Sequence, residues 1–181
     1  SFVFVMLTMT KASMERIFEV LDTNIDVEEP EFPITVDKVY GEVEFDHVHF
    51  SYGKQQDEEV ISNINFKIKP GEVFGIIGPT GSGKSSLVQL IPRLYDTTAG
   101  TVRVGGHDVR EYRFADLRQN VSMVLQKNTL FSGTIRENLL WGNPDATEEE
   151  MIQAAKHAQA HDFIMEMPDG YDTHVEQGGS N

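Results

Sequence analysis

The chain has no cysteine among its 181 residues, and it has few basic residues for its length. The lack of cysteine excludes disulfide bonds and thiolate metal sites, and it suits a reducing compartment. The chain carries 15 lysines and arginines against 29 aspartates and glutamates, which gives a formal net charge of −14. This charge repels phosphate backbones, and no basic cluster offsets it, so the composition argues against nucleic acid as a partner.

A long hydrophobic run is also absent near the N-terminus. The apolar stretch at residues 2–7 is far shorter than the ~20 residues that span a bilayer. It lacks the basic start and the small-residue cleavage site of a secretory signal peptide. Two interpretations stay open: a short buried helix start, or the cut end of a longer membrane helix. The helical spacing continues beyond it, and one face is formed by Met14, Ile17, Phe18 and Leu21.

An acidic segment follows this helical pattern. Residues 22–31 lack apolar periodicity, and Pro30 and Pro33 disfavour a helix there. We therefore predict an extended linker between the N-terminal helix and the rest of the chain.

After the linker, apolar and polar residues alternate, which predicts antiparallel strands. The alternation runs over residues 43–50, with one slip of register near Asp46-His47, and it returns over residues 61–68. Residues 101–104 are followed by Gly105-Gly106, which is typical of one arm of a β-hairpin.

A glycine-rich loop lies between these strand segments and is the most informative part of the chain. Residues 78–85, Gly-Pro-Thr-Gly-Ser-Gly-Lys-Ser, fit the pattern G-x-x-x-x-G-K-[ST] of phosphate-binding loops. The apolar run 73–77 before it predicts a buried strand, and residues 85–91 after it have helical spacing. Such a loop aims backbone N–H groups at a triphosphate, so the sequence predicts a nucleotide triphosphate site.

The last third of the chain is predominantly helical by pattern. Residues 121–125 predict one more strand, which ends at Gln126. Thr147 and Glu150 have the spacing of a capping box, so a helix is expected to begin after Thr147. Its apolar stripe is Met151, Ile152, Ala155 and Ala158. Residues 162–164 are expected to open a further short helix.

Taken in order, these segments resemble the nucleotide-binding domain of an ABC transporter of the exporter type, with a membrane domain fused in front. The resemblance runs from about Ser13 to the last residue. Separate motifs carry it: the aromatic A-loop at 50–53, the phosphate loop at 78–85 with Ser86 after it, the Q-loop at Gln126 with the segment 128–138, and the membrane-helix junction at 12–22.

The resemblance implies a role for each motif residue. Tyr52 stacks on adenine, Lys84 meets the β- and γ-phosphates, and Ser85 ligates Mg²⁺. The amide of Gln126 touches Mg²⁺ or the attacking water and senses the γ-phosphate. Lys84 and Gln126 are thereby the implied catalytic residues, and Ser85 and Gln126 the implied metal ligands. The implied ATP-binding residues are Tyr52, Gly78, Pro79, Thr80, Gly81, Ser82, Gly83, Lys84, Ser85, Ser86 and Gln126.

Three motifs of the family are not found in the chain. These are the Ser-Gly-Gly-Gln signature, an apolar strand ending in Asp-Glu, and a switch histidine; residues 178–181 lie where the signature is expected to begin. The loop 173–179 resembles the family's coupling loop but has Gln177 and Gly178 where Glu and Arg are common. We therefore expect this chain, as a domain truncated before the signature, to bind ATP weakly without turnover, while its parent protein hydrolyses ATP.

The implied fold is α/β: a P-loop NTPase core with an antiparallel β-subdomain and the start of an α-helical subdomain, incomplete at the C-terminus. The implied divisions are the end of the last membrane helix with its extension (1–21), the acidic linker (22–38) and the nucleotide-binding domain (39–181). The implied partners are a fused or associated transmembrane domain and a second nucleotide-binding domain in a head-to-tail dimer, at the cytoplasmic face of the cell membrane. The alternatives are a non-hydrolytic nucleotide-binding module and a soluble ABC-type ATPase.

Overall fold

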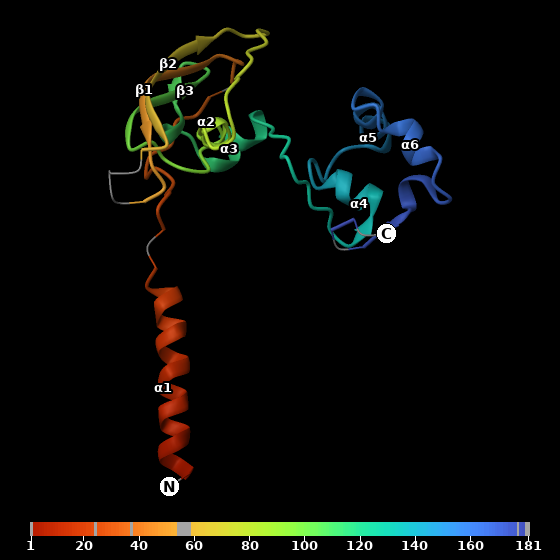
Figure 1. Ribbon diagram of the computed structural model, residues 1–181. Helices are drawn as coiled ribbons and strands as arrows, with labels where there is room; N and C mark the ends of the chain where they lie inside the picture. Colours follow the sequence, from red (N-terminus) through yellow and green to blue (C-terminus); the bar gives the residue numbers. More distant parts are fainter. Residues whose placement is uncertain (1, 24, 37, 54–58, 177, 180–181) are drawn as a thin grey trace. The chain divides into compact units, whose positions relative to one another are not determined.

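The computed structural model describes residues 2–23, 25–36, 38–53, 59–176 and 178–179 (Figure 1). The chain divides into two compact units, Ser1–Ser122 and Met123–Asn181, and each is described by itself. The first unit begins with α1 (Phe2–Leu21), a single helix of 20 residues. Of the apolar stretch 2–7, the described side chains are Phe4 and Met6, and both are exposed; the other side chains of the stretch lie outside the described residues, so both interpretations stay predictions. Among the described residues, no helix combines the length and the apolar character needed to cross a membrane.

The first unit is built on a four-stranded antiparallel sheet with the order β2-β1-β3-β4. The strands are β1 (Val43–Phe50), β2 (Ile61–Ile68), β3 (Ala99–Val104) and β4 (His107–Asp108). The strands predicted from alternation are therefore confirmed. Gly105 and Gly106 both have positive φ, as a two-residue hairpin turn requires, so the predicted hairpin of β3 and β4 is confirmed as well.

The slip of register predicted in the first strand is present as a bulge. The pairing of β1 shifts between Phe45 and Val48, and His47 adopts a φ of 48°. The backbone N–H of His47 donates to Asn65 Oδ1 at 2.8 Å, which satisfies a group that the ladder leaves unpaired. On the other side, Gly100 approaches so closely that a Cβ there would lie 2.1 Å from the His47 carbonyl oxygen.

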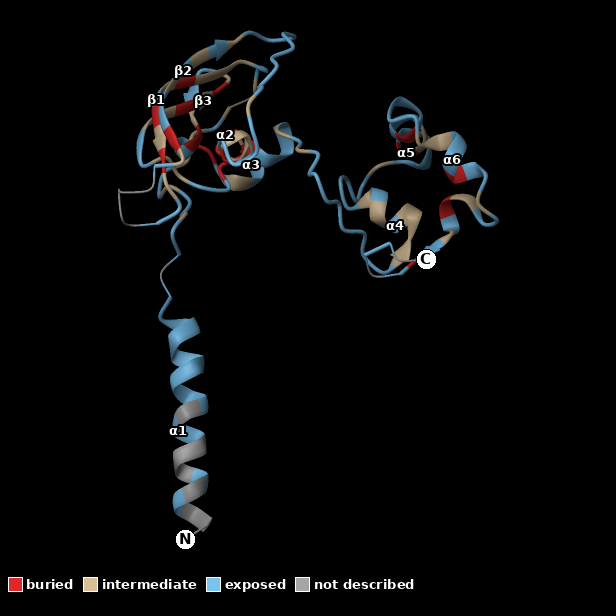
Figure 2. Ribbon diagram, viewed as in Figure 1, coloured by how far each residue is buried: buried red, intermediate tan, exposed pale blue. Residues whose placement is uncertain are grey.

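Two short helices cover one face of this sheet: α2 (Lys84–Gln89) and α3 (Phe114–Asn120), with the 3-10 turn η1 (Val109–Glu111) before α3 (Figure 1). The buried hydrophobic residues of the first unit lie mostly in the strands of the sheet and in these helices (Figure 2), and they form one core cluster. They include Phe45, Val48 and Val102 from the sheet, Leu87 from α2 and Leu117 from α3. This packing holds α2, and with it the glycine loop before α2, against the sheet.

The acidic linker is packed onto this unit. Among its described residues, segment 22–38 contains no helix or strand, as predicted. Ile34 and Val36 pack against the core, and the Glu29 carboxylate accepts the backbone N–H of Phe114 at 2.8 Å. The Glu28 carbonyl accepts a hydrogen bond of 2.8 Å from the guanidinium of Arg93, a buried residue that follows α2.

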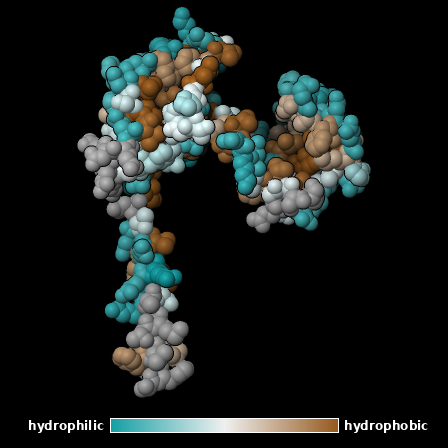
Figure 3. Space-filling view, viewed as in Figure 1, coloured by the Kyte–Doolittle hydropathy of each residue, from teal (hydrophilic) through white to brown (hydrophobic). Residues whose placement is uncertain are grey.

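Two predicted strands are absent from the described structure, at residues 73–77 and 121–125. Val73 and Ile77 are 96% and 99% exposed, and Val124 is 90% exposed. A buried strand depends on neighbouring strands for its hydrogen bonds and for cover on both faces, and the described residues pair with neither segment. The predictions of a buried strand at 73–77 and of a strand at 121–125 are therefore wrong. The space-filling view shows hydrophobic surface on the first unit (Figure 3).

The second unit is a small helical assembly tied by one strand pair. Its elements are β5 (Gly133–Thr134), α4 (Ile135–Leu140), α5 (Glu148–His157), α6 (His161–Met165), η2 (Gly170–Asp172) and β6 (His174–Val175), and β5 pairs with β6. The capping box predicted at Thr147 and Glu150 is confirmed, as is the short helix α6. Met151 and Ala155 form the core with Ile164 and Tyr171. Of the predicted apolar stripe, Ala158 is exposed.

Candidate nucleotide-binding site

The glycine loop has the backbone conformation that its sequence predicts. Gly81 and Gly83 adopt φ values of 83° and 79°, in the left-handed region that favours glycine, and α2 begins directly after the loop at Lys84. A Cβ on Gly83 would lie 2.8 Å from the carbonyl oxygen of Val60, so no other residue fits without displacing backbone. Gly78 and Gly83 are half-buried, while Pro79, Thr80, Gly81 and Ser82 lie exposed on the loop.

The Lys84 side chain is folded back over this loop. Its ammonium group donates to the carbonyl oxygens of Gly78 and Pro79, at 2.8 and 2.7 Å. The Ser82 hydroxyl lies 3.4 Å from the same nitrogen. The loop therefore holds a positive charge within its own turn. An ammonium group has three N–H donors, and phosphate oxygens can accept hydrogen bonds from them. This donor set fits the phosphates of a nucleotide.

A cavity of about 340 Å³ adjoins the loop on the side of β2. Its walls are mainly apolar, contributed by Ile61, Ile64, Ile76, Ile77 and Leu87. Among the described residues that line it, Lys84 is the one with a charge. This space suits hydrophobic packing better than a triphosphate, which needs several donors. The polar part of the site is therefore the loop itself.

Tyr52, the expected adenine-stacking residue, is close to the start of α2. Its hydroxyl lies 2.7 Å from the Oγ of Ser86, although Tyr52 itself is 57% exposed. The Tyr52 ring also contacts the rings of Phe50 and Tyr95 edge-on, with centroids 4.8 and 5.1 Å away. The fold thus brings an exposed aromatic ring next to the phosphate loop. Sequence reasoning missed Tyr95, because nothing in its local pattern distinguishes it from an ordinary aromatic residue.

The residues also fit a magnesium ion that is held mainly by phosphate oxygens. Ser85 is exposed at the first turn of α2, and within the described part of the chain its hydroxyl makes no hydrogen bond. The described residues contain no group of three His, Asp or Glu side chains that could hold a metal ion by themselves. Mg²⁺ commonly takes one or two protein oxygens together with substrate phosphates and water, which is the role that Ser85 suits.

Gln126 belongs to the second unit, whereas all the other predicted site residues lie in the first. It is exposed, and the segment after it leads to α4. In that segment Phe131 is fastened to α4, because the Asn138 side chain accepts its N–H at 2.8 Å and donates to its carbonyl at 2.9 Å. The Phe131 ring also stacks on Trp141 at 4.6 Å. The site is therefore described as two separate parts, the loop with Tyr52 and the segment with Gln126. Gln177, in the predicted coupling loop, lies outside the described residues.

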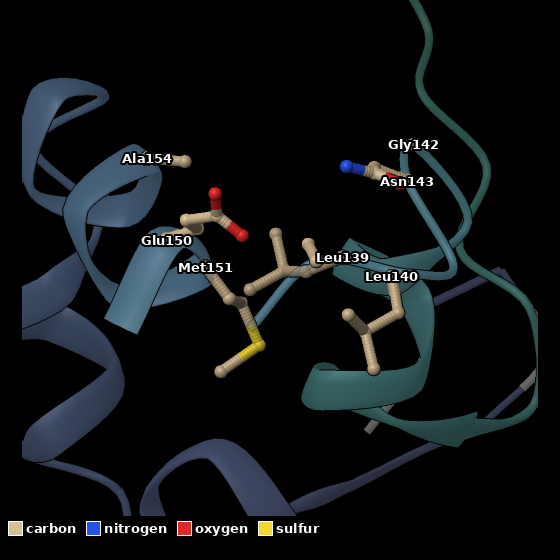
Figure 4. Close-up of a pocket in the computed structure, with 8 residues that line it drawn as sticks. Leu139, Leu140, Gly142, Asn143, Glu150, Met151 and Ala154 are labelled. Atoms are coloured by element: carbon tan, nitrogen blue, oxygen red, sulfur yellow. The ribbon is translucent and has the colours of Figure 1, made fainter. Parts of the chain in front are cut away.

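The second unit has a cavity that no sequence motif marked. It measures about 380 Å³ and lies between α4 and α5, where Leu139, Leu140 and Met151 approach one another (Figure 4). The carboxylate of Glu150 at its edge is already engaged, since it accepts the backbone N–H of Thr147 at 2.8 Å. This hydrogen bond, together with one from the Thr147 hydroxyl, holds the pKa of Glu150 below its usual value.

Comparison with known proteins supplies the family. The model of the ABC transporter family matches residues 61–179, which is more than half of the chain and includes the phosphate loop and Gln126. The chain belongs to the ABC transporter family.

Relatives of the ABC transporter family share sequence with nearly the whole chain. A putative multidrug export ATP-binding/permease protein of Bacillus subtilis, YgaD, is 46% identical over 96% of this chain. YknU of the same organism, an uncharacterised ABC transporter ATP-binding protein, is 43% identical over 98% of it. The chain spans 30% of the length of each of these relatives.

Among solved structures, a bacterial Atm1-family ABC exporter with ATP bound has a TM-score of 0.83 to this chain and 34% sequence identity. The match covers 95% of this chain and 30% of the exporter chain. The predicted fold class is thereby confirmed: the chain has the α/β fold of an ABC exporter nucleotide-binding domain, with its antiparallel sheet beside the phosphate loop. The prediction of the family from four motifs is confirmed as well.

Proposed function

We propose that this chain is the ATP-binding part of an ABC exporter subunit, which couples ATP binding and hydrolysis to transport across a membrane. The observation that carries the proposal is the glycine loop that gathers the Lys84 ammonium over its own carbonyl oxygens. The names of its relatives, an ATP-binding/permease protein and an ATP-bound exporter, support the same function. They favour an exporter over a soluble ATPase.

Each residue then has a definite task toward ATP. The ammonium of Lys84 leaves the loop carbonyls for the β- and γ-phosphate oxygens, and backbone N–H groups of the loop hold the remaining oxygens. Tyr52 offers its ring to the base, which is worth about 1–3 kcal/mol for base–aromatic stacking. Ser85 and Gln126 hold Mg²⁺, and Gln126 senses the γ-phosphate. The ion neutralises phosphate charge when bound.

For the whole protein we propose the arrangement that the resemblance implies. Residues 1–21 continue from the last membrane helix, 22–38 form the linker, and 39–181 belong to the nucleotide-binding domain. Two such domains pair head-to-tail, as a homodimer or a heterodimer, at the cytoplasmic face of the membrane. The fused transmembrane domain selects the transported substrate. The permease part of the YgaD name supports the fusion.

This chain by itself should bind ATP weakly and turn it over negligibly. Hydrolysis needs positioned phosphates, a metal ion and a residue that orients or deprotonates the attacking water. The 181 residues supply the loop that positions the phosphates and two of the proposed metal ligands, Ser85 and Gln126. They contain no apolar strand that ends in Asp-Glu, so the acidic metal residue and the general base are missing from them. By this reasoning the chain is a binding module, and hydrolysis belongs to the longer protein.

The test is a comparison of Lys84→Ala with Lys69→Ala, two lysine substitutions in the same unit. Calorimetric titration with MgATP should show weak binding to the unchanged chain and to Lys69→Ala, and about tenfold weaker binding to Lys84→Ala, as for a lost charged hydrogen bond. Phosphate release should stay at background for all three. Equal ATP affinity of the two variants would refute the proposed site. Turnover near 1 s⁻¹ that Lys84→Ala abolishes would refute the binding-module part.

A further inference from the structure

Part of the acidic linker is fastened to the first unit by hydrogen bonds. The Glu29 carboxylate accepts the backbone N–H of Phe114 at 2.8 Å, and the N–H of Ile34 donates to the Glu111 carbonyl at 2.9 Å. Phe114 is the first residue of α3, and the first N–H groups of a helix have no partner within it. Residues 28–36, here called the strap, therefore satisfy a donor that α3 cannot pair by itself.

The third attachment of the strap is Arg93, which follows the phosphate-loop helix. Its guanidinium donates to the Glu28 carbonyl at 2.8 Å and to the Asp96 carboxylate at 2.7 Å. Arg93 is only 5% exposed, so water has little access to the guanidinium. A strap that moves away therefore leaves a buried N–H group without its acceptor, which costs the desolvation of that group.

The segment that carries Arg93 is continuous with the phosphate loop. Lys84 is the first residue of α2, and hydrogen-bonded turns continue beyond the end of the helix, from the Arg93 N–H to the Leu90 carbonyl and from the Leu94 N–H to the Gln89 carbonyl. Leu90, between the two ends, is fully buried. A short segment packed in this way shifts as one piece, because close-packed cores transmit strain. The strap therefore holds one end of a segment whose other end presents Lys84.

We propose that docking of the strap and binding of phosphate are coupled: the strap positions α2 through Arg93, and a triphosphate at Lys84 in turn keeps the strap closed. Arg93 is thereby a positioning residue, since it acts through α2. The inference rests on the proposed function, because it assumes that ATP binds at this loop. Its consequence is that a displacement of α1, which precedes the linker, reaches the phosphate site within the first unit.

Coupling of this kind is reciprocal. The factor by which MgATP favours the closed strap equals the factor by which an open strap weakens MgATP binding. Two amides report closure of the strap, because the N–H groups of Ile34 and Phe114 are each bonded across its edge. The N–H of Gly105, which donates to the Glu42 carbonyl at 2.8 Å elsewhere in the first unit, is the matched control.

The first experiment measures amide hydrogen exchange by NMR on the full chain, without and with saturating MgATP. We expect MgATP to slow exchange of Ile34 and Phe114 about fivefold or more, and to leave Gly105 unchanged. Lys84→Ala, at the same MgATP concentration, should show a smaller effect. Unchanged exchange at both strap amides, or equal slowing at Gly105, overturns the inference.

The second experiment opens the strap by substitution and measures ATP affinity by calorimetric titration. Glu29→Ala removes one attachment. Arg93→Lys keeps a positive charge beside Asp96 but loses the guanidinium fork that also reaches the Glu28 carbonyl. The two substitutions are combined in a double variant. Glu31→Ala, which removes another exposed carboxylate from the same linker, is the matched control for the change in charge.

The double variant should exchange its Ile34 amide faster than Glu31→Ala does, and it should bind MgATP about fivefold or more weakly, while protection of Gly105 confirms folding. Equal ATP affinity of the two variants overturns the coupling. An Ile34 amide that keeps its protection shows that these attachments do not hold the strap, which overturns the inference as well. If the unchanged chain binds MgATP no more tightly than Lys84→Ala, the proposed function itself has failed. Binding that depends on Lys84 without a response of the strap is a failure of this inference alone.

Discussion

Replacing Arg93 with methionine should destabilise the first unit far more than an ordinary surface arginine would. The Arg93 residue is 5% exposed and adopts a φ of 52°, which is unusual for a residue other than glycine. Its guanidinium donates to both carboxylate oxygens of Asp96, at 2.7 and 3.1 Å, and to the Glu28 carbonyl at 2.8 Å. It therefore ties the end of the phosphate-loop helix to the acidic linker.

The size of the effect follows from which groups lose their partners. Methionine keeps most of the apolar stem but has no guanidinium group. The Asp96 carboxylate and the Glu28 carbonyl therefore lose their hydrogen-bond donor. Removing one partner of a buried ion pair costs about 3–5 kcal/mol. Because the Asp96 side chain is 28% exposed, water can solvate its carboxylate in the variant and reduce this cost. We therefore expect a loss of about 2–4 kcal/mol in the free energy of unfolding of the first unit.

Arg113→Met is the matched control. Arg113 also pairs with an aspartate three positions later, Asp116 at 3.4 Å, but its side chain is 54% exposed. Exposed pairs contribute about 0–1 kcal/mol, so this variant should resemble the unchanged chain.

The assay is urea unfolding followed with two probes. Far-ultraviolet circular dichroism reports on both units, while fluorescence of the single tryptophan, Trp141, reports on the second. Arg93→Met should lower the urea midpoint of a circular dichroism transition and leave the tryptophan transition in place, because Arg93 and its hydrogen-bond partners all lie in the first unit. A loss below about 0.5 kcal/mol, equal to that of Arg113→Met, would refute the reasoning.

Other substitutions test the bulge and the capping box. Gly100→Ala should destabilise the first unit by about 3 kcal/mol or more, since its Cβ would lie 2.1 Å from the His47 carbonyl oxygen at a φ of 77°; Gly106→Ala, which has a similar φ and open space, should cost only about 1–2 kcal/mol in the same urea assay. Thr147→Ala should cost about 1 kcal/mol in the second unit, read from the Trp141 transition, because the helix loses its N-cap; an unchanged midpoint contradicts this. Hydrogen bonds from Thr147 lower the pKa of Glu150 from its ordinary 4.5, so its contribution to stability is complete above pH 4.5 and is lost as the pH falls through the lower folded value. Glu150→Gln should flatten that part of the acid unfolding profile, and an identical profile would count against the assignment.

The parts of the fold that the sequence predicted correctly are those with local causes. The bulge shows as a break in alternation at Asp46-His47, and the hairpin as a glycine pair after β3. The capping box at Thr147 depends only on residues three positions apart. The phosphate loop belongs to the same class, because its glycine conformations are a requirement of its own backbone.

The parts that could not be predicted depend on distant partners. Residues 73–77 read as a buried strand because their composition is apolar, yet composition does not supply the neighbouring strands that such a segment needs. Arg93 and Tyr95 are the opposite case, because the sequence predicted no role for either residue. Each looks like an ordinary residue after α2, and only the fold shows that one holds the linker and the other contacts Tyr52. No pattern within a short window contains that information.

The neighbours of the phosphate loop show which elements fix its backbone conformation. The loop has its glycine conformations and its bound lysine although residues 73–77 before it are not a strand. The elements that hold it lie on the other side: α2, whose Leu87 is buried against the sheet, and Val60, whose carbonyl excludes any side chain at Gly83. Tyr52 reaches the loop through the same helix, by way of Ser86. If the proposed function holds, phosphate and base recognition both depend on the packing of α2 on the antiparallel sheet. Substitutions at that packing surface should then lower ATP affinity more than substitutions in 73–77 do.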